Sequence, residues 1–233
     1  MSRYFKYIPY FMAGVLLLVA FFLPRAGAKW QEAVSTESSM EGKGTIILDP
    51  GHGGRDPGMT GSTGVNEKEL NLVYAKKLKE LLEQAGYEVI MTRETEEGLY
   101  DEDAANKKAQ DMQRRCALIE EVKPLLTVSI HQNSYQDSSV RGPQVFYYEH
   151  STEGQKLASM IQKQLNEELT ETTSRQEKAN STYYILKQSK GTAVIVECGF
   201  LTNPQEEALL IQEDYQNRAA AAICRGILEY LGE

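Results

Sequence analysis

Apolar residues follow two different periods along this chain, and the two periods alternate. Continuous apolar runs of strand length lie at residues 125–130 and 192–196, and weaker runs of the same kind lie at 45–48, 87–91 and 144–148. Short continuous runs of this kind are typical of strands that are buried on both faces. The pattern therefore predicts a sheet whose strands lie mostly in the interior of the protein.

Segments with helical spacing separate these runs. Residues 67–85 carry Leu70, Leu78 and Leu82 on one face, and Gly86 stands where the end of a helix is expected. Further predicted helices lie within residues 106–120, 157–169 and 215–230. Strands that alternate with helices predict an α/β fold, with a mainly parallel twisted sheet flanked by helices on both faces.

The same pattern divides the chain into parts. Residues 45–233 contain all of the predicted strands and helices, and about 190 residues suffice for one domain with a sizeable core. Residues 29–44 are mostly polar, with serine, threonine and glycine, and we predict that they form a short linker.

Residues 1–28 have the composition of an export segment. Arg3 and Lys6 precede a nearly unbroken apolar stretch at residues 8–23, and residues 26–28 have the A-x-A pattern of a cleavage site. The apolar stretch is also nearly long enough to span a bilayer. Both a cleaved signal peptide and a retained membrane anchor fit, and either one predicts that the domain acts outside the cytoplasm.

Charge and cysteine content narrow the possible functions. The net charge is −8, which argues against nucleic acid as a partner, because contacts with phosphate need clustered lysine and arginine. Cys116, Cys198 and Cys224 are an odd number and form no C-x-x-C pair. We therefore expect buried apolar cysteines and no disulfide framework.

Histidine is scarce, and two of the three histidines follow predicted strands. His52 comes after the first strand within a glycine-rich segment, and His131 follows the run at 125–130 directly. Ligands of open α/β sheets bind outside the carboxyl ends of the strands, so both imidazoles are expected at that edge. His150 lies among polar residues in a predicted turn, where a solvated side chain is the expectation.

Two glutamates are expected at the same edge of the sheet. Glu67 opens the helix that follows His52, and Glu197 ends the run at 192–196. A catalytic zinc site needs three protein ligands and an open position, so these four side chains suffice for a His-Glu-His site and a general base. Taken alone, Glu67 could merely complement a helix N-terminus. An acid that ends a buried strand, however, needs a partner.

Other residues near these positions allow further interpretations. Asp49 and Asp56 could also bind metal, although acids beside proline more often serve turns. The glycines around His52 lack the lysine-serine pair and the spacing of a phosphate-binding loop. Cys198 alternates to the face opposite Glu197, which favours a place in the core over a role as nucleophile. Four tyrosines could stack on sugar rings, although strand packing is commoner: Tyr147, Tyr148, Tyr183 and Tyr184.

Four blocks of sequence resemble the zinc-dependent N-acetylmuramoyl-L-alanine amidases of the amidase 3 type. In chain order they are ILDPGHGGRDPG, NEKELNL, VSIHQNS and VIVECGFLTNP. The resemblance implies a single zinc ion held by His52, Glu67 and His131, with Glu197 as the catalytic acid and base. It also implies that Asn133 supports the site or the substrate, and that the substrate is peptidoglycan.

Within this family the chain is most similar to the CwlD-type amidases of endospore formers. The similarity lies in residues 106–120, in the single N-terminal apolar segment and in the lack of wall-binding repeats. It implies release of peptide stems at the forespore membrane and cortex, a first step toward muramic-δ-lactam. It also implies a secreted or lipoprotein activating partner, and membrane contact only through the N-terminal segment. A zinc peptidase that cuts within the stem, or a non-catalytic wall-binding protein on the same fold, is the alternative.

Overall fold

The six strands of the domain form one sheet in the order β2-β1-β3-β6-β4-β5. Strands β2, β1, β3 and β6 run parallel to one another, β4 is antiparallel to β6, and β5 is parallel to β4. The bounds are β1 Thr45–Pro50, β2 Glu88–Met91, β3 Leu126–Asn133, β4 Gln144–Tyr148, β5 Lys178–Asn180 and β6 Ala193–Phe200. The prediction of a mainly parallel sheet is confirmed.

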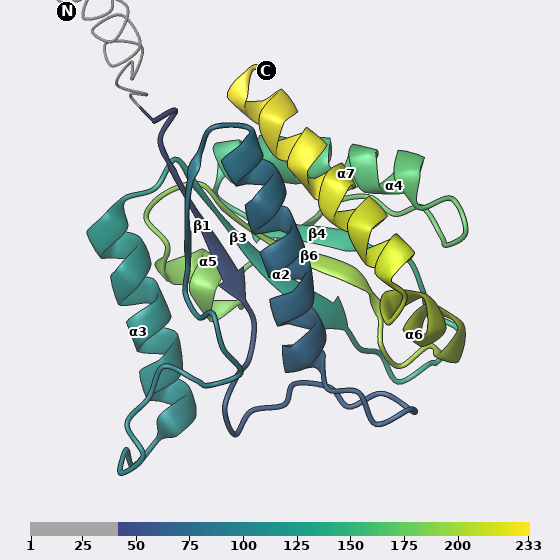
Figure 1. Ribbon diagram of the computed structural model, residues 1–233, viewed down its shortest axis with the longest axis horizontal. Coiled ribbons are helices and arrows are strands. Elements are labelled where there is room, and N and C mark those ends of the chain that lie inside the picture. The colour runs from purple at the N-terminus through teal and green to yellow at the C-terminus, as the bar shows by residue number, and fades with distance from the viewer. Residues whose placement is uncertain (1–41) are drawn as a thin grey trace, which may run out of the picture. The chain divides into compact units, whose positions relative to one another are not determined.

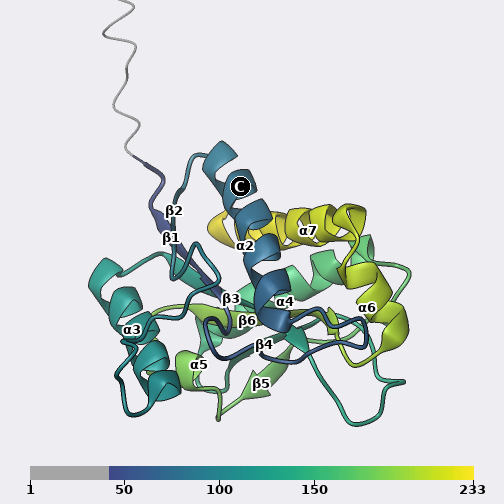
Figure 2. The same ribbon diagram turned by 60° about the horizontal axis from the view of Figure 1, so that its bottom comes forward.

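Helices cover both faces of this sheet, as predicted (Figures 1 and 2). Helices α2, α4 and α7 cover one face, where α7 packs against both α2 and α4, and α3 and α5 lie on the other face. The bounds are α2 Glu67–Gln84, α3 Lys107–Val122, α4 Thr152–Glu168, α5 Tyr184–Gln188, α6 Pro204–Leu210 and α7 Glu213–Leu231. The second face is therefore covered by one long helix and one short helix.

The computed structural model describes residues 42–233. The segment at 1–28 that we predict to be a signal peptide or anchor, and most of the predicted linker at 29–44, lie outside the described residues. Within residues 42–233, none of the helices combines the length and the hydropathy needed to cross a bilayer.

Alternation along the strands sorts side chains between the two faces. In β1, Ile46 and Leu48 join the core beneath α2, α4 and α7, and Ile47 joins the smaller core beneath α3 and α5. In β6, Cys198 is fully buried in the larger core, as predicted, and Glu197 points to the opposite face. Glu197 therefore lies on the side of the sheet that carries α3 and α5.

Strands β3 and β6 are longer than the apolar runs that predicted them. Their parallel pairing continues through His131, which lies opposite Glu197, so both residues belong to strands and do not follow them. The backbone ladder does not require apolar side chains, and for this reason hydropathy marked these strand ends too early. Elements β5, α5 and α6 were not predicted, because each is too short to show a period.

Helix α3 is fixed in place at both of its ends. The side chain of Asn106 accepts a hydrogen bond from Ala109 N at 3.0 Å, as an N-cap does. At the other end Lys123 has a left-handed backbone (φ 51°), and Pro124 follows it. Because both ends are fixed, the side chains of α3 keep a defined position relative to the sheet.

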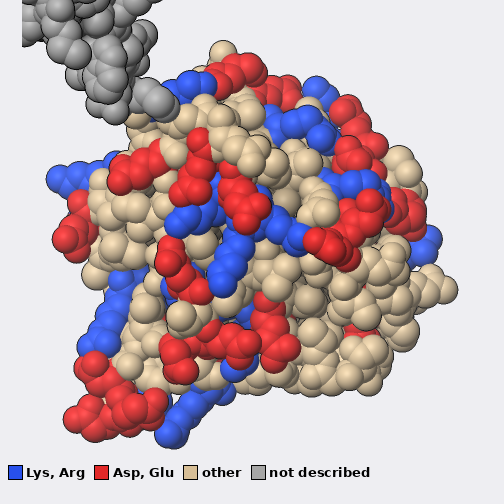
Figure 3. Space-filling view, in the orientation of Figure 1, with Lys and Arg blue, Asp and Glu red and all other residues tan. Residues whose placement is uncertain are grey.

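Charged side chains are mixed on the face of the domain seen in Figure 3, where α2 and α7 lie. Lysine and arginine are interspersed with aspartate and glutamate over this face. No continuous basic stripe is seen on this face of the described residues, as expected for a chain with a net charge of −8 that is not predicted to bind nucleic acid.

Candidate active site

A cavity of about 640 Å³ opens at the carboxyl ends of β1, β3 and β6, on the side of α3 and α5. Parallel strands bring their ends to one edge of a sheet, where ligands bind in α/β folds. Helix α3 lines one side of the cavity and the start of α5 lines another. Its lining includes His52, Glu67, His131, Asn133 and Glu197.

Three of the predicted residues meet in this cavity. Nε2 of His52 lies 3.1 Å from Oε1 of Glu67, and Nδ1 of His131 lies 2.9 Å from the same oxygen. The two imidazole rings stand edge to face with centroids 5.0 Å apart. One ligand atom from each residue thus lies within 4.8 Å of the other two, a cluster that could hold a metal ion.

Backbone groups hold Glu67 in this position at the start of α2. Its Oε2 accepts a hydrogen bond from Met59 N at 2.8 Å, and its Oε1 accepts one from Gln132 N at 3.2 Å. The carboxylate is buried, which would raise its pKa, but His131 and His52 lower the pKa below its usual range. Glu67 therefore carries its charge in the cluster and is more than a complement to the helix dipole.

Glycine is required at two positions around the cluster. A Cβ on Gly51 would stand 2.2 Å from Nε2 of His131, and a Cβ on Gly58 would stand 2.4 Å from Oε2 of Glu67. Gly58 also has a φ of +68°, which side chains disfavour. The glycines at these positions thus let the backbone approach the side chains of the cluster closely.

His52 has an unusual backbone, with a φ of 62°. Two guanidinium groups converge on its carbonyl oxygen: Arg93 donates Nε at 2.8 Å and Arg115 donates Nη2 at 2.6 Å. Both also donate to the carbonyl oxygen of Pro50, at 3.0 Å and 2.8 Å. These bonds hold the loop in a conformation that histidine adopts rarely, and so they orient the imidazole.

The charge of Arg115 is balanced by two buried acids. Nη1 lies 2.6 Å from Oδ1 of Asp49, and Nε lies 2.6 Å from Oδ2 of Asp111. Burial alone would raise the pKa of Asp49, but Arg115 and hydrogen bonds from Ser129 and Thr92 lower it to about 2. Our interpretation of Asp49 as a metal ligand or turn residue is wrong, because both of its oxygens serve this ion pair and its hydrogen bonds within the sheet.

Asp56 lies behind His52, away from the cluster. Its Oδ2 is 3.1 Å from Nδ1 of His52, and its Oδ1 accepts a hydrogen bond from Gly58 N at 3.1 Å. The second contact belongs to a turn, as predicted for an acid beside proline. Burial would lower the pKa of His52, but its contacts with Asp56 and Glu67 raise this pKa to about 9.

Glu197 faces the cluster from the neighbouring strand. The residue is 6% exposed, and its Oε2 has no hydrogen-bond partner among the described residues. Burial raises the pKa of Glu197 to about 7, helped by repulsion from Glu67 and opposed by His131 and His52. A carboxyl group with this pKa can take up and release a proton near neutral pH.

Some of the remaining candidate residues line the cavity, and others lie outside its lining. Asn133 and Tyr183 are half-buried and line the cavity, and the ring of Tyr183 packs edge to face on Phe146 with centroids 5.4 Å apart. Tyr184 also lines the cavity and is 44% exposed, whereas Tyr148 lies on β4 against His150. The side chain of His150 is 74% exposed, which confirms that it is solvated.

Arg93, Arg115 and Lys108 were not among the residues predicted for the site. Arg115 lies on a predicted helix that is rich in charged residues, yet it is 1% exposed. A signal was present, since Arg115 lies on the same helical stripe as Met112 and Ile119. For Arg93, which follows β2, the sequence shows no comparable signal.

The cluster has the composition that zinc prefers. Two imidazole nitrogens and a carboxylate oxygen are its usual ligands in catalytic sites, where a fourth position stays open for water or substrate. The unpartnered oxygen of Glu197 faces the same space, as a base beside that open position would. Three ligand atoms next to a buried carboxylate are the arrangement of metal-dependent hydrolases.

The chain belongs to the N-acetylmuramoyl-L-alanine amidase family, whose sequence model matches residues 46–229. This confirms the resemblance drawn from the four motifs. Enzymes of this family hydrolyse the amide bond between N-acetylmuramic acid and L-alanine, so the substrate of this enzyme is peptidoglycan.

Its relatives include proteins of known name and structure. The germination-specific N-acetylmuramoyl-L-alanine amidase of Bacillus subtilis is 38% identical over 191 residues, which are 81% of this chain and 80% of that protein. The probable cell wall amidase LytH of Staphylococcus epidermidis is 33% identical over 84% of this chain, but the match covers only 60% of LytH.

Two solved structures place the fold in the same family. The CwlD amidase of Clostridioides difficile, solved in complex with the GerS lipoprotein, has a TM-score of 0.78 and 38% identity, over 81% of this chain and 98% of that one. The catalytic domain of CwlV from Paenibacillus polymyxa has a TM-score of 0.71 and 31% identity, over 80% and 97%.

Proposed function

We propose that this enzyme cleaves the amide with the help of a zinc ion held by His52, Glu67 and His131. The observation that supports the proposal is the convergence of these three ligand atoms beside Glu197, whose buried Oε2 has no hydrogen-bond partner within residues 42–233. A zinc ion bound there would polarise the lactyl carbonyl and lower the pKa of a water molecule.

Glu197 acts as the proton carrier in this proposal. It takes a proton from the attacking water and delivers it to the nitrogen of the departing L-alanine, because an amine leaves poorly without that proton. Its position directly across the β3–β6 ladder from His131 keeps it at a fixed distance from the cluster. Asn133, which follows His131 on the same strand, supports the site or the substrate at the rim of the cavity.

Digestion of purified peptidoglycan tests the proposal. We expect mass spectrometry to find free stems that begin with L-alanine, and we expect a zinc chelator to prevent their release. Cleavage within the stem would instead indicate a zinc peptidase. Bound zinc without cleavage of either vegetative or spore peptidoglycan would favour the non-catalytic wall-binding alternative.

We also propose a role in the spore cortex, as a first step toward muramic-δ-lactam. The support is the similarity to the germination-specific amidase of Bacillus subtilis and to CwlD of Clostridioides difficile. The latter was solved in complex with a lipoprotein, and we propose a secreted or lipoprotein partner here as well. The predicted export segment at residues 1–28 fits action at the forespore membrane and cortex.

His131→Ala should remove zinc from the purified protein. The variant keeps only two of the three proposed ligands, and a site needs three to hold zinc with an open position. Metal content by elemental mass spectrometry is the measurement. His150→Ala is the control, because that side chain is exposed and is not part of the cavity lining. Normal zinc content in His131→Ala would refute the role of His131 as a ligand.

A further inference from the structure

The two ring nitrogens of His52 face two different carboxylates. Nε2 points into the cluster toward Glu67, and Nδ1 lies 3.1 Å from Oδ2 of Asp56 on the other side of the ring. A neutral imidazole has one N–H and one lone pair. If Nε2 gives its lone pair to a cation, Nδ1 carries the hydrogen, and Asp56 is the group that accepts it.

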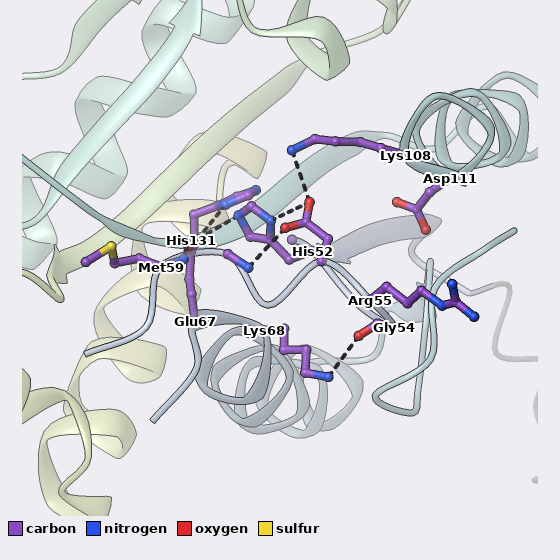
Figure 4. A network of polar contacts seen from close by, with 12 residues as sticks. His52, Gly54, Arg55, Met59, Glu67, Lys68, Lys108, Asp111 and His131 are labelled. Atoms are coloured by element: carbon purple, nitrogen blue, oxygen red, sulfur yellow. Dashed lines mark hydrogen bonds and ion pairs between the residues drawn. The ribbon is translucent and has the colours of Figure 1, made fainter. Parts of the chain in front are cut away.

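Asp56 is itself held on three sides. Gly58 N donates to Oδ1 at 3.1 Å, and the backbone of Asp56 is bridged to Gly53 by two hydrogen bonds of 3.0 Å and 3.1 Å. The third contact comes from α3, where Nζ of Lys108 lies 3.1 Å from Oδ2, the oxygen that faces His52. Figure 4 shows Lys108 reaching from α3 toward the side of His52 opposite Glu67 and His131.

We propose that Asp56 is a positioning residue, which fixes the tautomer and orientation of His52 for metal binding, with a minor contribution from the exposed side chain of Lys108. The inference rests on the proposed zinc site. Carboxylates hydrogen-bonded to the free nitrogen of a metal-binding histidine make the imidazole a stronger ligand, and their loss weakens metal binding about 10- to 100-fold. Lys108 also balances part of the negative charge that Asp56 and Glu67 bring to the two sides of one ring.

The test compares zinc affinity, measured by competition with a chromophoric chelator, in the wild-type protein and in Asp56→Asn. We expect the variant to bind zinc about 10- to 100-fold more weakly. Lys108→Met should lose no more than about fivefold, because the Lys108 side chain is 74% exposed and exposed ion pairs contribute little. Asp56→Ser keeps a hydroxyl that can accept from Gly58 N, and should weaken zinc binding as Asp56→Asn does.

Two controls separate this role from a general effect on loops and charge. Asp137→Asn alters a similar turn, in which the carboxylate accepts from Ser139 N at 2.8 Å, but no histidine contacts it. Lys163→Met removes a comparable exposed lysine on the far face of the sheet. Both should bind zinc as the wild type does, and an equal loss in Asp137→Asn would overturn the proposal.

A spectroscopic measurement reports on the tautomer directly. In the zinc-loaded wild-type protein, long-range ¹H–¹⁵N correlation spectra should show His52 protonated at Nδ1 and protected from exchange. In Asp56→Asn this proton should exchange faster. Wild-type zinc affinity in both Asp56 variants would overturn the inference alone. Failure of the wild-type protein to bind zinc would overturn the proposed metal site, and the inference with it.

Discussion

Replacing Glu197 with glutamine is expected to reduce the hydrolysis of peptidoglycan by about 10²- to 10⁴-fold while zinc remains bound. Glutamine has the same shape but can neither accept the proton of the water nor deliver one to the leaving nitrogen. The ligand atoms of His52, Glu67 and His131 are untouched by the change. The rate of release of stems that begin with L-alanine and the zinc content of the same sample are the two measurements.

Glu168→Gln is a suitable control, since it makes the same chemical change on α4, across the sheet from the cavity. It should have wild-type activity. Activity within a few fold of wild type in Glu197→Gln would refute the assignment of the proton carrier. Loss of zinc in Glu197→Gln would show instead that the carboxylate belongs to the metal site.

Arg115→Met should destabilise the domain by about 3–5 kcal/mol, the usual effect of removing one partner of a buried ion pair. Asp49 and Asp111 would lose their common cation, and the carbonyl oxygens of Pro50 and His52 would each lose a donor. Denaturant unfolding measures the change. Arg114→Met is the matched control, because Arg114, the neighbour of Arg115 on α3, forms an exposed ion pair with Asp101 that should contribute about 1 kcal/mol or less.

The pH dependence of the Arg115→Met effect is a further check. The pKa of Asp49 is lowered to about 2, whereas an unfolded aspartate titrates near 3.9. Its ion pair therefore stabilises the fold fully above about pH 4, and this stabilisation disappears as the pH falls toward 2. The difference in unfolding free energy between wild type and Arg115→Met should shrink over that range. A constant difference would mean that the effect does not come from the pair with Asp49.

Much of this fold followed from hydropathy alone. The strands and the long helices have clear periods of hydropathy, because each of them buries one or two faces in the core. The meeting of His52 and His131 could also be foreseen, since each comes after an apolar run that predicts a strand of a parallel sheet. The role of Glu67 as a ligand, however, depended on the family resemblance, and the sequence pattern alone left it open.

The buried charges could not be predicted in the same way. Arg93 and Arg115 donate hydrogen bonds to backbone carbonyl oxygens. Every residue has a carbonyl group, so the sequence does not show which of them will need a buried donor. These donors stabilise the left-handed backbone of His52, and that backbone conformation is a property of the folded loop. Asp56 had a sufficient explanation as a turn residue, and only its distance from Nδ1 of His52 showed a second contact.

The pairing of His131 with Glu197 on adjacent strands has a consequence for how such an enzyme can diversify. Both residues belong to one hydrogen-bonded ladder, so their separation is set by strand spacing and by register. The sides of the cavity come from α3 and from the start of α5, which lie outside that ladder. Substitutions in α3 and α5 can therefore change which glycan or stem is accepted while the spacing between the proposed ligand His131 and the proposed base Glu197 stays the same.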